Sequence, residues 1–187
     1  MDMTGDRYLI TDQNAIYFLT FTVIDWVDIF SRKEYKLEII NSINYCINEK
    51  GLTVFAWVIM SNHIHFIWQA KQGYQLSSII RDFKSFTAKR ILEMIEHGKE
   101  SRKKWLLKKF EFAGKRTASK SNYKFWKNGN HAICLSELDQ SMMQQKLDYI
   151  HDNPVKAMIV ANPEDYIFSS AIVYSGEIGL VPVTIMH

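Results

Sequence analysis

The chain has few cysteines and no long apolar run, and each of these absences excludes a class of protein. The two cysteines, Cys46 and Cys134, lie far apart in 187 residues, which excludes a disulfide-rich scaffold and a cysteine-spaced metal site. No apolar run approaches the ~18–20 residues that a membrane-spanning helix needs. No basic segment followed by an apolar stretch begins the sequence, so we expect no signal peptide. We therefore expect reduced thiols and a cytoplasmic protein without a membrane partner.

Internal repeats and low-complexity linkers are also absent, and the remaining composition is that of a folded protein. Apolar residues make up 47% of the chain and aromatic residues 13%, which excludes a disordered chain. A length of 187 residues favours one domain with a full core. We expect a single domain over residues 1–187, with a core at residues 15–155 and a C-terminal extension over 156–187.

The positive charge is concentrated in one segment, although the formal net charge is only +3. Residues 99–127 are rich in Lys and Arg and contain only two acids, and aromatic residues are interleaved with the charges. Cations neutralise phosphates and rings stack on unpaired bases, so this pattern suits a nucleic-acid surface. A solvated basic loop beside ordinary core aromatics is the alternative, and the segment alone does not decide between them.

The first half of the chain contains clear periodic patterns. Residues 17–23 are rich in aromatic and β-branched residues and predict a first strand. A helix is expected over residues 31–49, with Ser31 as its N-cap. Two further strands are expected on either side of a tight turn at residues 61–62.

Farther along the chain, a second helix is expected over residues 77–96. Its apolar positions face inward and leave Arg81 and Lys84 on an outer face. The basic stretch over residues 99–122 has weak periodicity and predicts a flexible loop with a short helical piece. Residues 123–134 predict another strand.

A third helix and an irregular tail complete the prediction. Ser136 can cap this helix, which is expected to end near Asn153 because Pro154 disfavours helical geometry in the residue before it. The tail over residues 155–187 is expected to be irregular and to pack through its aromatic residues. The order of elements predicts an α+β fold of the ferredoxin-like type, a β-α-β-β-α-β antiparallel sheet with helices on one face. Such a fold alone does not imply a function.

The sequence His63-Ile64-His65 lies within an apolar run that predicts a buried β-strand. Side chains alternate along a strand, so His63 and His65 should point to one face and Ile64 to the other. Two neighbouring imidazoles can bind one metal ion. A hydrogen-bonded histidine pair is the alternative.

The third helix carries a second group of candidate residues. Tyr149 and Asn153 are four residues apart and share a helix face, which His151 does not. Tyr149 could act as a nucleophile if a cation, such as a metal ion, Lys146 or Lys156, offsets its high free pKa of about 10 and its place in the last helical turn. Asn153 could add a carbonyl oxygen to a metal held by the histidines. A packed aromatic residue and an ordinary helix terminator are the alternatives.

Several of these motifs resemble one protein family. Residues 60–68, Met-Ser-Asn-His-Ile-His-Phe-Ile-Trp, resemble the histidine–hydrophobic–histidine (HUH) motif of the single-tyrosine, IS200-like transposases. Residues 149–157 resemble the tyrosine-helix signature of the REP-associated branch of that family, and residues 165–171 its C-terminal motif. Two positions depart from the family pattern: Ser61 stands where proline is usual, and Met158 stands where glycine is common.

The resemblance implies a metal-dependent endonuclease and strand transferase acting on single-stranded DNA hairpins, in DNA transposition or repeat-element processing in a bacterial cytoplasm. It implies that Tyr149 attacks the scissile phosphodiester and forms a 5′-phosphotyrosine link. His63, His65 and Asn153 would hold a divalent cation. Ligand type alone admits Mn²⁺, Zn²⁺ or Fe²⁺, and the family favours Mg²⁺ or Mn²⁺. The covalent link would make ATP unnecessary, and the sequence contains no P-loop pattern.

Charge rather than the resemblance suggests the DNA-binding residues. These candidates are Arg81, Lys84, Lys103, Lys104, Lys108, Lys109, Arg116 and Lys127. A second copy of the chain is a further candidate partner. The alternative to an active enzyme is a non-catalytic or domesticated nucleic-acid-binding protein on the same fold.

Overall fold

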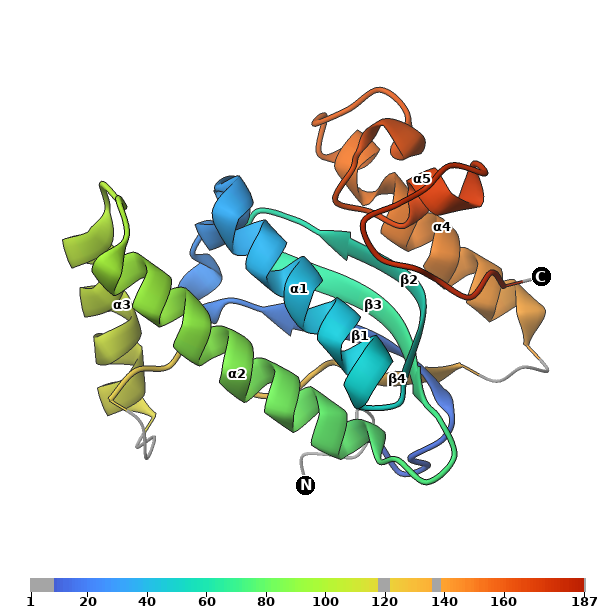
Figure 1. The fold of residues 1–187 in the computed structure, drawn as a ribbon, viewed down its shortest axis with the longest axis horizontal. Helices are drawn as coiled ribbons and strands as arrows, with labels where there is room; N and C mark the ends of the chain where they lie inside the picture. The colour runs from blue at the N-terminus through green and yellow to red at the C-terminus, as the bar shows by residue number, and fades with distance from the viewer. Residues whose placement is uncertain (1–8, 118–121, 136–138, 187) are drawn as a thin grey trace, which may run out of the picture.

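A four-stranded antiparallel sheet, in the order β2-β3-β1-β4, forms the centre of the fold (Figure 1). The computed structural model describes residues 9–117, 122–135 and 139–186. The strands are β1 (Ile16–Thr22), β2 (Leu52–Ile59), β3 (His63–Ala70) and β4 (Ile133–Leu135). Both β1–β3 and β2–β3 pair along most of their length, whereas β4 pairs only with the start of β1. This order confirms the ferredoxin-like prediction.

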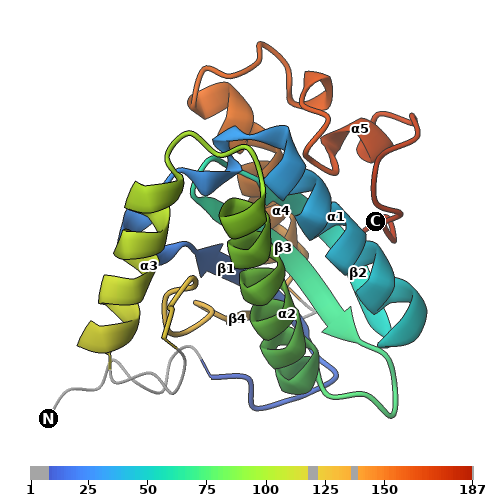
Figure 2. The same cartoon turned by 60° about the vertical axis from the view of Figure 1, so that its left-hand side comes forward.

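Helices lie on both sides of this sheet. Two long helices, α1 (Lys33–Glu49) and α2 (Leu76–His97), lie side by side over one face (Figures 1 and 2). On the opposite face lies α4 (Gln140–Lys156). The basic helix α3 (Lys103–Arg116) stands beside α2 at one end of the sheet. No helix in the described part of the chain is both long and apolar enough to cross a membrane.

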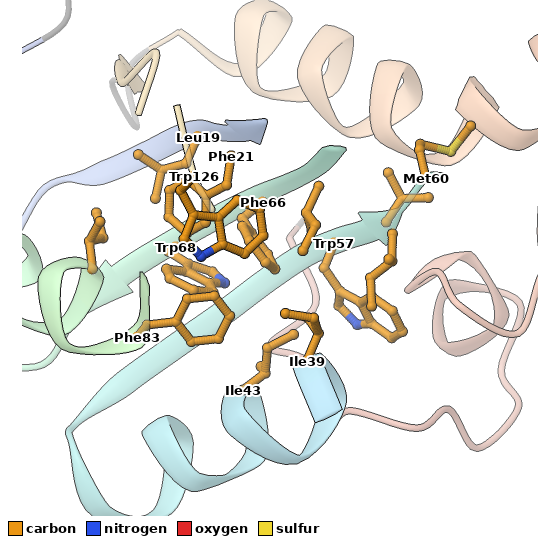
Figure 3. Close-up of a cluster of buried hydrophobic side chains, with 14 of the residues drawn as sticks. Leu19, Phe21, Ile39, Ile43, Trp57, Met60, Phe66, Trp68, Phe83 and Trp126 are labelled. Carbon is orange, nitrogen blue, oxygen red and sulfur yellow. The ribbon is translucent and has the colours of Figure 1, made fainter. Parts of the chain in front are cut away.

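The core fills the space between the sheet and the helix pair α1 and α2 (Figure 3). Strand alternation directs Phe21, Phe66 and Trp68 to this side, where Phe83 of α2 meets them. The Phe66 and Trp68 ring centroids lie 4.1 Å apart, and the Trp68 and Phe83 centroids 5.3 Å. Each such side chain stabilises the fold by about 1.5–3 kcal/mol through burial.

The predicted helix starts differ from those observed. Ser31 closes a short 3₁₀ turn, and Arg32 is the N-cap of α1, without a side-chain capping bond. The predicted cap Ser136 lies outside the described residues. Asp139 caps α4 instead, since its carboxylate accepts a hydrogen bond from the Met142 amide at 3.0 Å.

The prediction that the third helix ends before Pro154 is wrong, because α4 continues to Lys156. Proline removes one amide donor, and the remaining turn is closed by a Schellman motif. The Ile159 amide donates to the Pro154 carbonyl at 2.9 Å, and the Met158 amide to the Val155 carbonyl at 2.8 Å. Met158 therefore adopts the left-handed conformation, with φ of 56°, at a position that favours glycine.

The predicted basic loop is largely helical, since α3 contains 14 residues. Leu106, Phe110 and Ala113 recur at intervals of four and three and are buried, which gives this helix an apolar face. The strand predicted over residues 123–134 is shorter than expected. Only Ile133–Leu135 forms β4, and Trp126 makes an isolated bridge to Val23.

The C-terminal segment is mostly irregular, as predicted, apart from η4 (Pro163–Asp165) and α5 (Ala171–Tyr174). It lies along the outer edge of β2. Ser169 bridges Val58, and the Thr184 amide donates to the Val54 carbonyl at 2.9 Å. The aromatic side chains Tyr166 and Phe168 are buried, which confirms that the segment packs through its rings.

Candidate active site

The two histidines lie on the sheet face that α4 covers. His65 is paired with Thr20 of β1, and His63 with Thr22. His63 is half-buried, whereas His65 is only 4% exposed. Their ring centroids are 4.8 Å apart. The alternation of the strand thus brings two imidazoles together, as the sequence predicted.

A neighbouring amide fixes the tautomer of His63. The side-chain nitrogen of Asn62 donates to the Trp26 carbonyl at 3.3 Å, which turns its Oδ1 toward His63 Nδ1 at 2.7 Å. An amide oxygen only accepts, so His63 Nδ1 carries the hydrogen in this arrangement. The lone pair is then on Nε2 of His63, which is the arrangement of a metal-ligating histidine.

His65 contains a buried nitrogen without a partner. Its Nδ1 lies 2.9 Å from the Thr20 hydroxyl, whereas Nε2 is buried and has no hydrogen-bond partner within the described ranges. An unsatisfied buried polar atom costs about 1–3 kcal/mol, so it needs an explanation. Metal binding would supply a partner to Nε2, and the residues present fit a divalent cation in this respect.

The pKa values of both histidines favour the neutral form. Burial lowers the pKa of His63. Burial, assisted by the charges of His63, His131 and Lys146, lowers the pKa of His65 to about 3. A neutral imidazole is the form that binds metal ions. In the part of the chain that is described, no three His, Cys, Asp or Glu residues are placed to hold one metal ion, so a third protein ligand would have to be of another type.

Tyr149 reaches the histidines from α4. Its ring centroid lies 5.1 Å from that of His65 and 5.9 Å from that of Phe18. The side chain is 41% exposed, so a ligand can approach it from solvent. The expected place of Tyr149 in the last helical turn is wrong, because α4 extends seven residues past it to Lys156.

The other predicted residues of α4 have separate surroundings. Asn153 is partly buried, and its amide nitrogen donates to the Tyr149 carbonyl at 2.6 Å, so the side chain lies back along the helix. Its Oδ1 is the candidate ligand atom. Lys156 Nζ lies 6.0 Å from the Tyr149 ring centroid, and Lys146 Nζ lies 5.0 Å from that of Phe18. Lys156 also pairs with Asp152 at 3.4 Å, and Lys146 approaches the tyrosine only by way of Phe18, whose ring contacts that of Tyr149.

A hydrogen-bonded clamp holds α4 on the sheet. His151 Nε2 lies 2.9 Å from Ser170 Oγ, which in turn bonds both the Trp57 amide and its carbonyl. The His151 ring also contacts that of Tyr174. Burial lowers the pKa of His151 to about 4, against the opposing effect of Asp148 and Asp152. The C-terminal segment thus fixes the helix that carries Tyr149.

The predicted DNA-binding residues fall into two groups. On α3, Lys104 and Lys108 are exposed and Lys103 and Lys109 partly exposed, beside an exposed Trp105. Arg116 lies at the end of that helix and pairs with Asp25 at 2.9 Å. Arg81 is exposed on α2 and pairs with Asp82. Lys127 Nζ lies 4.0 Å from the Trp26 ring centroid.

The outer-face placement of Lys84 is wrong. Its Nζ donates to the Lys127 and Gly129 carbonyls and to Asn130 Oδ1, each at 3.0 Å. An ammonium group has three donors, so these bonds use all of them. Burial, with a contribution from Lys124, lowers the pKa of Lys84 to about 8. This lysine holds a loop together rather than facing solvent.

A buried carboxylate anchors the start of α3. Glu100 is 7% exposed and accepts hydrogen bonds from the Tyr35 hydroxyl at 3.1 Å and the Arg102 amide at 2.9 Å. Arg32 pairs with it at 3.3 Å. Burial alone would raise the pKa of Glu100, but these bonds and the arginine charges hold it below its usual range. A second ion pair, between Arg102 and Asp28 at 2.7 Å, completes the anchor.

Three residues beside the histidines were not singled out from the sequence: Thr20, Asn62 and Trp26. Thr20 becomes a candidate only when the β1–β3 register is known. Asn62 adjoins the histidine motif, and its role depends on the side-chain orientation. Trp26 reaches His63 because Asp25 and Trp26 both have positive φ, 51° and 57°, and no sequence pattern signals such a turn.

The fold and site together define an α+β protein in which a tyrosine on one helix faces a histidine pair on a ferredoxin-like sheet. Residues 12–115 match the family model described as transposase IS200-like. This match spans more than half of the chain, so the chain belongs to the IS200-like transposase family. The matched residues include His63 and His65 but not Tyr149.

Solved structures resemble this fold at low sequence identity. One, described as a REP-associated tyrosine transposase bound to a REP hairpin, has a TM-score of 0.62 and 18% identity, over 98% of this chain and 92% of that chain. Another, a Deinococcus radiodurans R1 protein assigned as a transposase, has a TM-score of 0.46 and 17% identity, over 81% of this chain and 98% of that chain. The first likeness supports the fold, and the second carries no argument. No curated protein sequence matches the chain.

Proposed function

We propose that this protein is a metal-dependent endonuclease and strand transferase for single-stranded DNA, acting through a 5′-phosphotyrosine intermediate. The observation that carries the proposal is the meeting of Tyr149 with His65, whose Nε2 is buried without a partner. A nucleophile beside a pair of neutral imidazoles suits phosphoryl transfer assisted by a metal ion. Membership in the IS200-like family agrees with this chemistry.

In this mechanism, His63 and His65 would hold the cation through Nε2, and Asn153 would add its amide oxygen. A bound Mg²⁺ or Mn²⁺ would supply Lewis-acid stabilisation of the phosphate charge. Tyr149 Oη forms a bond to phosphorus as the bond to the 3′-oxygen breaks, and the phenolic proton passes to water. The leaving 3′-oxygen takes a proton from water and becomes a free hydroxyl. Lys146 and Lys156 favour the approach of the phosphate by their charge.

The DNA would extend from the site to the basic helix. Ion pairs from Arg102 and Arg116 tie α3 to Asp28 and Asp25, which flank the turn beside His63. Exposed Lys104 and Lys108 would then neutralise phosphates of the same strand. We assign Lys84 no such contact, since its donors are occupied. One domain over residues 1–187 would carry the whole activity.

A hairpin is the proposed substrate class. The signature over residues 149–157 resembles the REP-associated branch, and the fold resembles a protein of that branch described with a REP hairpin bound. The clamp from His151 to Ser170 holds Tyr149 beside the histidines of its own chain, so one copy contains the complete set of residues. A dimer is not required for the chemistry.

The test is a cleavage assay on labelled single-stranded hairpin DNA with Mg²⁺ or Mn²⁺. Wild type should form a covalent protein–DNA adduct, and Tyr149→Phe should form none, because the variant lacks the attacking oxygen. EDTA should abolish the adduct. Cleavage by the Phe variant at the wild-type rate, or an adduct that survives EDTA, would contradict the mechanism.

The non-catalytic alternative has its own outcome in this assay. Binding of hairpin DNA by wild type, without cleavage in either metal over a range of hairpin sequences, would favour a binding protein on the same fold. Intact His63, His65 and Tyr149 favour the enzyme.

A further inference from the structure

Trp26 is an exposed indole beside the histidine pair. Its side chain is 57% exposed, whereas Trp57 and Trp68 are fully buried and Trp126 is 6% exposed. The Trp26 and His63 ring centroids lie 6.3 Å apart at an interplanar angle of 78°. The edge contact leaves much of the indole open to solvent at the point where the scissile strand would pass.

The backbone that presents Trp26 is strained and firmly held. Asp25 and Trp26 both have positive φ, which costs about 1–2 kcal/mol for each non-glycine residue. Three contacts maintain this turn: the Trp26 amide donates to the Val23 carbonyl at 3.1 Å, its carbonyl accepts from Asn62, and Asp25 pairs with Arg116. Strain of this kind concentrates at functional sites.

A cation lies against the same ring. Lys127 Nζ is 4.0 Å from the Trp26 centroid. The lysine itself is fixed, since its amide donates to the Thr22 carbonyl at 2.8 Å and its carbonyl accepts from Lys84. Thr22 is the register partner of His63, so the indole, the cation and the metal-site histidine belong to one end of the β1–β3 pair.

We propose that Trp26 stacks on an unpaired DNA base next to the scissile phosphate, with Lys127 neutralising a neighbouring phosphate. A rigid, exposed ring with an adjoining cation is how proteins hold single-stranded DNA without reading its sequence. We call the Trp26 ring the base platform. The Trp26 carbonyl also orients Asn62, and Asn62 orients His63, so the base platform and the proposed metal site share one chain of hydrogen bonds. This inference rests on the proposed function, since its ligand is the strand that Tyr149 would cut.

The experiment compares two probes in a Tyr149→Phe background, which prevents cutting. One is an oligodeoxythymidine of about 20 nucleotides, longer than the site sizes typical of single-strand binders, and the other is the same backbone with abasic residues throughout. Trp26→Ala should weaken binding of the thymidine probe about tenfold and that of the abasic probe less than twofold, because stacking on one base is lost. Trp26→Phe should keep most of the preference for the thymidine probe.

Tyr45→Ala is the matched control, because Tyr45 is also exposed, at 56%, but lies on α1 on the far side of the sheet. It should leave both affinities unchanged. Equal losses for the two probes in Trp26→Ala, or no loss, would overturn the inference, provided that thermal unfolding shows a folded variant. A folded Trp26→Phe variant with no thymidine preference would overturn it as well.

The two proposals fail separately. A Trp26-dependent thymidine preference in a protein that never forms the Tyr149 adduct would contradict the proposed function and leave the base platform standing. If the protein forms the adduct but its preference for the thymidine probe over the abasic probe does not depend on Trp26, only the base platform is contradicted.

Discussion

The two faces of the sheet are made from alternate residues of the same strands and differ in almost every physical property. On one face of β3, Phe66 and Trp68 pack against Phe83 in a dry aromatic core. On the other, His63 and His65 meet a partly exposed Tyr149. Among the described residues, each face keeps a buried nitrogen without a partner, Trp68 Nε1 on the aromatic face and His65 Nε2 on the other. Only the imidazole nitrogen can offer a lone pair to a cation, because an indole N–H only donates.

This contrast separates two kinds of substitution. Removing a ring from the aromatic face should lower the free energy of unfolding by several kcal/mol, because buried area and packing are lost. Replacing a polar group on the histidine face should remove activity without unfolding, because that face is not optimised for stability.

After Tyr149→Phe, which removes the nucleophile itself, the largest expected effect on activity comes from His65→Phe. We expect adduct formation to fall about a thousandfold, since the buried Nε2 is lost as a ligand. The free energy of unfolding should change by only about 1 kcal/mol, because removal of the unpaired Nε2 offsets the loss of the bond between Nδ1 and the Thr20 hydroxyl. Urea unfolding and the adduct assay together check this. Destabilisation by several kcal/mol would show that the histidine face also carries the fold.

Phe66→Ala should have the largest effect on stability. The ring is fully buried and contacts Phe21, Trp68 and Phe83, so we expect a loss of about 3–5 kcal/mol in the free energy of unfolding. Urea unfolding measures it, with Phe66→Leu as the matched control, which should cost less. A loss below about 1 kcal/mol would contradict the division between the faces.

Glu100→Gln tests a region that belongs to neither face. The change removes the buried charge between Arg32 and Arg102, and we expect a loss of about 1–3 kcal/mol. The pKa of Glu100 is below its usual range in the folded protein. The contribution of this carboxylate to the free energy of unfolding is therefore complete above the ordinary carboxyl pKa and is lost as pH falls through the folded pKa. The difference between wild type and variant should therefore shrink below a pH of about 4. A difference that is constant with pH would contradict the ionic anchor.

The smallest effect is expected for Met158→Gly at the end of α4. Met158 is 91% exposed with φ of 56°, so glycine relieves backbone strain without removing packing. We expect a gain of about 0.5–1 kcal/mol in thermal or urea unfolding and no change in adduct formation. Met158→Ala is the control, since it keeps the strain. A loss of stability in the glycine variant would show that the methionine packs in solution.

The sequence predicted the fold and the histidine face because both depend on local patterns. Alternation along a strand set His63 and His65 on one side, and helical spacing brought Tyr149 and Asn153 together on one helix. The order of elements then predicted a ferredoxin-like antiparallel sheet, which the strand order β2-β3-β1-β4 confirms.

The errors arose where long-range contacts decide the structure. Lys84 turns inward because carbonyls from residues 127 and 129 accept its protons, more than forty residues away in sequence. The helix carrying Tyr149 continues past Pro154 because a Schellman turn closes it farther along. The position of Trp26 depends on two left-handed residues, which single-residue preferences disfavour.

The segment that bridges Val58 through Ser169 and reaches Val54 through Thr184 has a consequence for protein synthesis. A nascent chain extended only through α4 has an uncovered β2 edge, and its Tyr149 helix lacks the clamp to Ser170. The edge is covered and the tyrosine locked in place only after these later residues leave the ribosome. Assembly of the site is thereby coupled to translation of its C-terminal segment, which also covers a strand edge that would otherwise invite pairing with other chains.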